Sequence, residues 1–270
     1  MKIKTINNLF EYLKNINKDT KEWTHNGFAK PWFRGLSNKK YILLPSILRN
    51  GNDKFEFQIT KKFRLVAPGF GETPETNRID QWLFLMQHLE LPTRLLDWSE
   101  SPLVAAFFAT LKAIYKNDIK NNASVFAIDP IELNKISIGE EDFPVTWVQN
   151  KVLQTIKFAF NTQEEQVFIN NQYIKISYSE LPIAIYPSTV HSRIKAQKGC
   201  FTLHGSDKRD FETIFKDTLI KRERLIKYII PKDKIINFHN ELNDAGISYS
   251  ILFPDLDGLA KELKYQFGIK

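Results

Sequence analysis

The sequence predicts an α+β protein in which a mixed or antiparallel sheet forms the core and helices flank it. About five to seven short segments have β character, and helical segments lie both between and before them. The apolar fraction of 43% and the 21 phenylalanines provide enough material for a substantial core. The length of 270 residues fits one large domain or two small ones.

The N-terminal third begins with a predicted surface helix over residues 5–16, where apolar side chains recur at helical spacing. These side chains are Ile6, Phe10, Leu13 and Ile16. The Trp-Phe-Arg-Gly sequence at residues 32–35 follows and predicts a strand that Gly35 ends or bulges.

Arg34 is a single charge between Phe33 and Gly35. Its planar guanidinium can form two parallel hydrogen bonds to a phosphate or a carboxylate, and the neighbouring glycine admits a close backbone approach. A surface arginine on an edge strand is the alternative interpretation.

Polar residues between two apolar helices form the most distinctive stretch of the chain, residues 87–102. An amphipathic helix is predicted over 53–66, and a helix that is apolar on most faces, and is therefore buried, over 79–89. His88 lies at its inner end, where it could serve as a general base or as a helix-end histidine bonded to the backbone.

A short strand over 93–98 follows, with alternate side chains on opposite faces. Arg94 and Asp97 could form an ion pair that braces this loop. Ser101 is a predicted N-cap before Pro102, and the positive end of the next helix, 103–115, suits an anionic ligand.

The second half of the chain contains further strands and two helices. Strands are predicted over 124–129, 181–187, 200–203, 225–231 and 247–253. Helices are predicted over 233–245 and from Leu256 onward. The pattern weakens between 131 and 185, which suggests an insertion or peripheral subregion.

Several classes of protein are disfavoured. No run of about 18 apolar residues exists, so no membrane span and no membrane partner are expected. The single cysteine, Cys200, allows no intramolecular disulfide, fits a reducing cytoplasm and is best explained as a packed thiol. No metal-ligand motif is present, so no metal site is expected unless distant residues build one. The phosphate-loop and nucleophile-elbow motifs are also absent.

Four motifs together resemble the FRG domain family. They are Trp-Phe-Arg-Gly at 32–35, Q-H-x-x-L-P-T-R-L-L-D-W-S-x-S-P-L-V-A-x-x-F-A at 87–109, A-Q-x-G-x-F-T at 196–202 and L-F-P-D-L-D-G-L at 252–259. The resemblance extends from about residue 25 to 265. It implies a single FRG domain over 1–270, with the helix at 5–16 and the insertion at about 131–185.

The aromatic-Arg-Gly motif also resembles, more distantly, the first motif of the NAD-dependent ADP-ribosyltransferase superfamily. This resemblance implies an ADP-ribosyltransferase-like fold with NAD as substrate. It places Arg34 and Gln197 in catalysis. His88, which would lie near the ribose or the nicotinamide, is a third candidate catalytic residue. The residues expected to bind NAD are Arg34, Gly35, Thr93, Arg94, Asp97 and Ser99. Gln197 departs from the usual glutamate, and its neutral amide cannot offset a positive ribose as a carboxylate would. Strong activity would then require another carboxylate, such as Asp97 or Glu90.

Three functions are therefore considered. The first is an enzyme that moves ADP-ribose from NAD to a macromolecule or hydrolyses NAD, as would suit a toxin or an antiphage effector. The second is a non-catalytic module that binds a nucleotide or phosphate. The third is a nucleic-acid-binding protein, and the net charge of +7 also makes nucleic acid a possible acceptor for the enzyme. The oligomeric state is left open.

Overall fold

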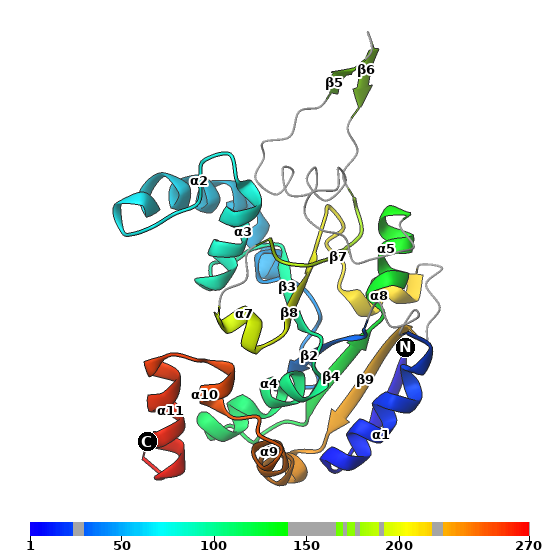
Figure 1. The fold of residues 1–270 in the computed structure, drawn as a ribbon. Coiled ribbons are helices and arrows are strands. Elements are labelled where there is room, and N and C mark those ends of the chain that lie inside the picture. The colour runs from blue at the N-terminus through cyan, green and yellow to red at the C-terminus, as the bar shows by residue number, and fades with distance from the viewer. Residues whose placement is uncertain are drawn as a thin grey trace.

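The computed structural model describes residues 1–23, 30–139, 166–169, 172–175, 179–188, 192–217 and 224–269. In this part of the chain, seven strands form a mixed sheet with helices on both faces (Figure 1). The predicted α+β class with flanking helices is confirmed. None of the described helices is long and apolar enough to cross a membrane.

The sheet has the strand order β1-β9-β4-β2-β3-β8-β7. Its strands are β1 Lys2–Thr5, β2 Trp32–Leu36, β3 Leu95–Ser99, β4 Ala123–Ile128, β7 Ile183–Ile185, β8 Gly199–Leu203 and β9 Leu225–Ile230. β1 runs parallel to β9, and every other neighbouring pair is antiparallel. β5 Gln166–Ile169 and β6 Gln172–Lys175 form a separate two-stranded sheet.

The sheet is nearly split between β2 and β3. These strands pair at one position only, Phe33 with Ser99, whereas β2 and β4 pair over the full length from Trp32 to Leu36. β3 likewise pairs with β8 along its whole length. The two halves of the sheet therefore diverge beyond Phe33, and this divergence makes room for a site.

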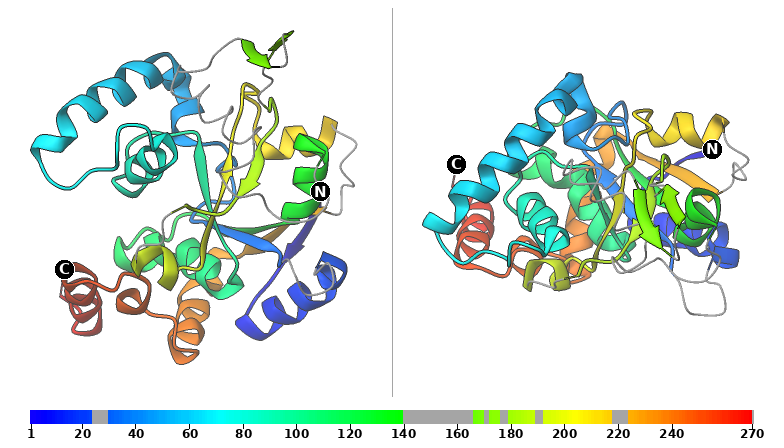
Figure 2. Two further views of the ribbon diagram at one scale, coloured as in Figure 1. Left: turned by 45° about the horizontal axis from the view of Figure 1, so that its top comes forward. Right: turned by 90° about the horizontal axis from the view of Figure 1, so that it is seen from above.

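Helices cover both faces of the sheet (Figure 2). They are α1 Leu9–Asp19, α2 Glu56–Val66, α3 Ile79–His88, α4 Pro102–Tyr115, α5 Pro130–Ile138, α7 Ser192–Ala196, α8 Phe211–Asp217, α9 Ile235–Asp244, α10 Tyr249–Leu252 and α11 Leu256–Gln266. On one face, α1, α4 and α9 pack over the β1-to-β2 half and α3 packs over the β3-to-β7 half. On the other face, α5 and α8 share one cluster with both halves.

The N-terminal prediction was partly wrong. A strand, β1, precedes the helix, which starts at Leu9 after the N-cap Asn8. β1 escaped detection because its lysines are charged, yet Lys2 and Lys4 both pair with the buried carboxylate of Asp19 at the end of α1.

The apolar face of α1 was also assigned incorrectly in part. Phe10 is 77% exposed and Leu13 is 38% exposed. Tyr12 points inward instead, because its ring packs against Tyr228 of β9 and Phe238 of α9.

The strand predicted over 247–253 is wrong, because this segment contains the short helix α10. The rings of Tyr249 and Phe253 stack with centroids 4.5 Å apart, and the Phe253 amide donates to the Tyr249 carbonyl. Aromatic residues four apart thus meet on a helical turn, and their β propensity is overridden by this packing.

The stretch from 131 to 185 belongs to the main fold at both ends. Asp129 caps α5, and the side chain of Asn134 bonds both the amide and the carbonyl of Ala184 in β7. α5 is therefore fixed to the sheet and is not peripheral. Residues 140–165 lie outside the described residues.

Candidate functional site

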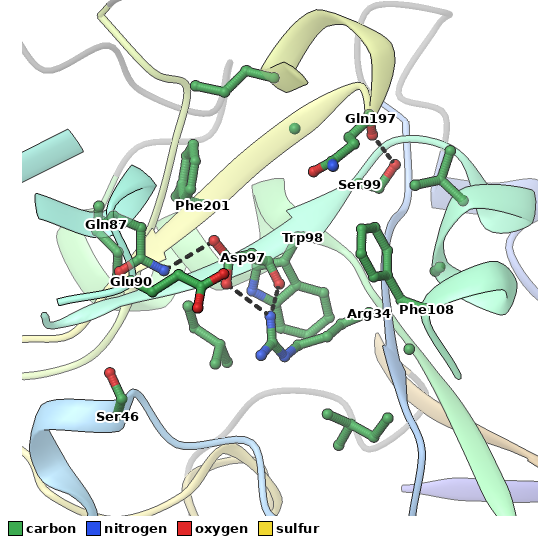
Figure 3. Close-up of a pocket in the computed structure, with 18 of the residues that line it drawn as sticks. Arg34, Ser46, Gln87, Glu90, Asp97, Trp98, Ser99, Phe108, Gln197 and Phe201 are labelled. Atoms are coloured by element: carbon green, nitrogen blue, oxygen red, sulfur yellow. Dashed lines mark hydrogen bonds and ion pairs between the residues drawn. The ribbon is translucent and has the colours of Figure 1, made fainter. Parts of the chain in front are cut away.

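A cleft of about 590 Å³ lies where β2 and β3 diverge. Its lining comes from both of these strands, from α3 and α4, from the 3-10 segment Ser46–Phe55, and from the α7–β8 turn (Figure 3). Six predicted site residues converge here from distant parts of the chain, Gly35 together with five residues whose side chains carry polar groups. These five are Arg34, His88, Asp97, Ser99 and Gln197.

Arg34 crosses the gap between the diverging strands. Its Nη1 donates to the backbone carbonyl of Asp97 and lies 3.3 Å from the Asp97 carboxylate. β2 and β3 do not pair at Asp97, so no β2 amide donates to its carbonyl, and the Arg34 guanidinium donates the hydrogen bond instead. Its Nε is buried and has no hydrogen-bond partner among the described residues.

Gln87, which sequence reasoning did not select, orients the Asp97 carboxylate from the other side. Its Nε2 donates to Asp97 Oδ1 at 2.9 Å, and its Oε1 accepts from the hydroxyl of Thr93. Thr93 is buried and does not line the cleft, so its predicted contact with NAD is not supported. Thr93 acts on the site only through Gln87.

Arg94 is also absent from the lining of the cleft, contrary to its predicted role in NAD binding. It is buried and forms a two-pronged ion pair with Glu56 at the start of α2, with Nε and Nη2 each 2.7 Å from a carboxylate oxygen. It also donates to the carbonyl of Gly205. The expected Arg94–Asp97 pair does not form, because residues three apart on a strand face opposite sides.

Ser99 and Gln197 line the cleft and also fasten its walls together. The Ser99 hydroxyl donates to the Gln197 carbonyl at 2.6 Å, and the Gln197 side-chain amide donates to the Leu252 carbonyl at 3.0 Å. These bonds connect β3, the α7–β8 turn and α10. The Ser99 hydroxyl hydrogen and one hydrogen of the Gln197 side-chain amide are therefore already engaged in hydrogen bonds within the protein.

Gly35 lines the cleft, but its missing side chain is required by helix packing. A Cβ at this position would lie 1.8 Å from the Ala105 carbonyl oxygen of α4. The close backbone approach predicted for Gly35 therefore occurs with α4.

Glu90 ends helix α3 in a left-handed conformation with φ +60°. The Leu91 amide donates to Met86 O and the Glu90 amide to Gln87 O, which is the Schellman pattern that normally contains glycine at this position. The Glu90 carboxylate points toward Arg34 and Asp97 (Figure 3). Within the described residues it makes no hydrogen bond or ion pair. His88 is exposed on the same helix end.

The described residues offer neither a reactive cysteine nor a cluster of metal-binding side chains. Burial raises the pKa of the Cys200 thiol well above its usual value, helped by the negative charges of Glu100 and Asp97, so the predicted packed thiol is confirmed. No group of three or more His, Cys, Asp or Glu side chains in the described ranges could hold a metal ion.

The comparison with known families agrees with the first set of motifs. A model of the FRG domain family matches residues 29–118. Residues 29–118 are an FRG domain. No curated protein and no solved structure matches the chain.

The FRG domain supplies one side of the cleft. It contains β2, the 3-10 segment, α3, β3 and α4, and therefore Arg34, Glu90 and Asp97. The opposite wall, with Gln197 and Arg193, lies outside the matched range. That the FRG unit extends over all 270 residues stays a prediction, as does the ADP-ribosyltransferase-like part of the fold.

Proposed function

We propose that the cleft binds NAD and that the chain transfers ADP-ribose to a macromolecular acceptor or hydrolyses NAD. The observation that carries this proposal is the convergence of Arg34, His88 and Gln197, with Asp97 and Ser99, on one cleft. The cleft volume lies within the range typical of small-molecule sites. Aromatic walls, including Phe108 and Phe201, offer surfaces for a nicotinamide or adenine ring.

The reaction requires a negative charge beside the ribose. The bond between ribose C1′ and the nicotinamide nitrogen breaks, the electron pair leaves with nicotinamide, and positive charge develops on the ribose. Water, or a hydroxyl or amine of the acceptor, then adds to C1′ and loses a proton. A carboxylate stabilises this transition state better than the neutral Gln197 amide.

Glu90 is the carboxylate best suited to this role. Asp97 already bonds Arg34 and Gln87, so its charge is partly neutralised. Glu90 has no such partner among the described residues and points into the same space (Figure 3). His88, which lines the cleft at the same helix end, would accept the proton from the incoming nucleophile.

The acceptor class follows from charge. With a net charge of +7, the protein attracts anionic macromolecules, so nucleic acid is the proposed acceptor. Modification of nucleic acid or depletion of NAD would fit a toxin or an antiphage effector.

The test is nicotinamide release from NAD by the purified protein, with and without RNA or DNA. We expect release from the wild type and loss of release in Arg34→Ala. Arg209→Ala is the matched control, because Arg209 pairs with Asp207 and Asp217 on the surface outside the cleft. If neither the wild type nor the control released nicotinamide, the proposal would be contradicted.

A second function, a non-catalytic nucleotide-binding module, is favoured by one observation. The Ser99 hydroxyl and the Gln197 amide are both committed to holding the walls together. A rise in melting temperature with NAD or ADP-ribose, without nicotinamide release, would favour this function over the enzyme.

A further inference from the structure

The far end of the cleft is formed by a kinked 3-10 segment, Ser46–Phe55. Arg49 is extended there (φ −84°, ψ 143°), and Asn50 and Gly51 that follow have φ of 55° and 70°. Beside this kink, the Arg49 guanidinium lies on the carbonyl of Leu44, to which Nε and Nη2 donate at 2.8 and 2.6 Å. One edge of the guanidinium is thus fixed, and the group lines the cleft.

Arg34 and Arg49 face the same space without a full set of counter-charges. Burial lowers the pKa of Arg49, and the positive charge of Arg34 lowers it further, while Asp97 opposes this to a smaller extent. Around Arg49, the positive influence of Arg34 therefore exceeds the negative influence of Asp97. The Nε of Arg34 adds a buried donor with no partner among the described residues.

We propose that Arg34 and Arg49 form a subsite that binds the diphosphate of a dinucleotide. A diphosphate spreads more than one negative charge over several oxygens and can accept from both guanidinium groups at once, so it matches two arginines better than the single charge of one carboxylate. The Ser46 hydroxyl points into the cleft from the same segment and offers a further donor (Figure 3).

Charge then orders the ligand along the cleft. Glu90, which also lines the cleft, repels phosphate and favours the ribose that becomes positive. Arg49 attracts phosphate. The orientation of NAD inferred here rests on the proposed function, but the diphosphate subsite itself does not require turnover.

The experiment measures binding of three probes by calorimetry: inorganic pyrophosphate, ADP-ribose and adenosine. We expect the wild type to bind pyrophosphate and ADP-ribose and to bind adenosine far more weakly. Arg49→Gln should weaken both phosphate-bearing probes by about tenfold or more, because charge-assisted hydrogen bonds are lost. Arg209→Gln, a surface control, should bind like the wild type.

Wild-type protein that does not bind pyrophosphate, or Arg49→Gln that binds it normally, would overturn the subsite. If Arg49→Gln does not fold, Arg49→Lys keeps the charge, loses the fork, and should show an intermediate loss. Pyrophosphate binding without NAD turnover would support the subsite and contradict the proposed enzyme. NAD turnover that Arg49→Gln leaves unchanged would support the proposed enzyme and contradict the subsite.

Discussion

At the scale of single residues, Glu90 is the position where local stability and the proposed chemistry conflict. A left-handed conformation costs a residue with a side chain about 1–2 kcal/mol relative to its preferred backbone, and glycine is the usual residue at such a helix end. Glu90 nevertheless adopts φ +60° with its carboxylate in the cleft. Strain of this kind in a cleft proposed to bind a ligand supports a functional role for the side chain.

Replacing Glu90 by glycine should therefore separate stability from activity. We expect Glu90→Gly to be about 0.5 kcal/mol more stable, because relief of strain exceeds the entropy lost by glycine. Nicotinamide release should fall by about 100-fold, as for loss of an electrostatic group at a transition state. Urea unfolding and a release assay measure the two effects.

The control for Glu90→Gly is Asn117→Gly. Asn117 also has a positive φ, 51°, but does not line the cleft. Its replacement should leave nicotinamide release unchanged. Full release by Glu90→Gly would show that the carboxylate has no part in the reaction.

Arg94 illustrates the opposite case, a charged residue that serves structure. Burial raises the pKa of its partner Glu56, and the Arg94 charge opposes that rise. Arg94→Ala should lower the free energy of unfolding by about 3 kcal/mol or more, because Glu56 is left with an unpaired buried charge. Affinity for ADP-ribose, measured on the folded fraction, should not change. A specific loss of affinity would restore Arg94 to the ligand site.

At the scale of elements, the contact between β2 and α4 fixes one wall of the cleft. An added Cβ at Gly35 would meet backbone atoms of Ala105 and Ala109. Gly35→Ala should therefore lower the free energy of unfolding by about 3 kcal/mol, the upper end of the cost of overpacking. Gly71→Ala, where nothing lies within 4 Å, is the matched control and should unfold at nearly the same urea concentration. Equal stability of the two variants would refute the tight β2–α4 contact.

Elements with a clear local pattern were predictable from the sequence. The strands around Arg34 and Asp97, the buried helix α3 and the Ser101 cap of α4 all follow from alternation, helical periodicity and capping chemistry. β1 and α10 were not predictable, because their structure depends on distant partners. Asp19 neutralises the lysines of β1, and aromatic packing across α10 and Phe253 overrides its strand propensity.

At the scale of the whole molecule, the sequence predicted a few of the residues that line the cleft but not the geometry that brings them together. The split between β2 and β3 depends on how two strands far apart in the sequence diverge, and a local sequence pattern carries no information about this. For the same reason Gln87 and Arg49 were missed, since each gains its role only from Asp97 or Arg34 across the gap. Arg94 and Thr93 were overestimated because the motif does not reveal which side chains turn inward.

Two buried histidines should make the whole fold sensitive to acid. Burial, and then the Arg94 charge against the opposing effect of Asp207, lowers the pKa of His204 to about 3, and burial lowers the pKa of His239 to about 4. In the unfolded chain both have a pKa of about 6.5. Below about pH 6.5 the unfolded state therefore binds protons that the folded state does not bind. The free energy of unfolding falls as the pH drops from about 6.5 toward these values.

The expected slope is about 1.4 kcal/mol per pH unit for each histidine once the pH is well below 6.5. Urea unfolding at several pH values between 7 and 4.5 measures it. His204→Leu should reduce the slope by about half over this range. A slope that is the same in this variant would mean that His204 takes up protons in the folded state.

The central claim is that the gap between β2 and β3 is a dinucleotide site, and a crystal structure of the protein with ADP-ribose tests it most directly. We predict that the diphosphate lies within hydrogen-bonding distance of the Arg34 and Arg49 guanidinium groups, with the terminal ribose on the side of Glu90. ADP-ribose bound elsewhere on the molecule, or lying in the cleft with its diphosphate remote from both arginines, would contradict the account.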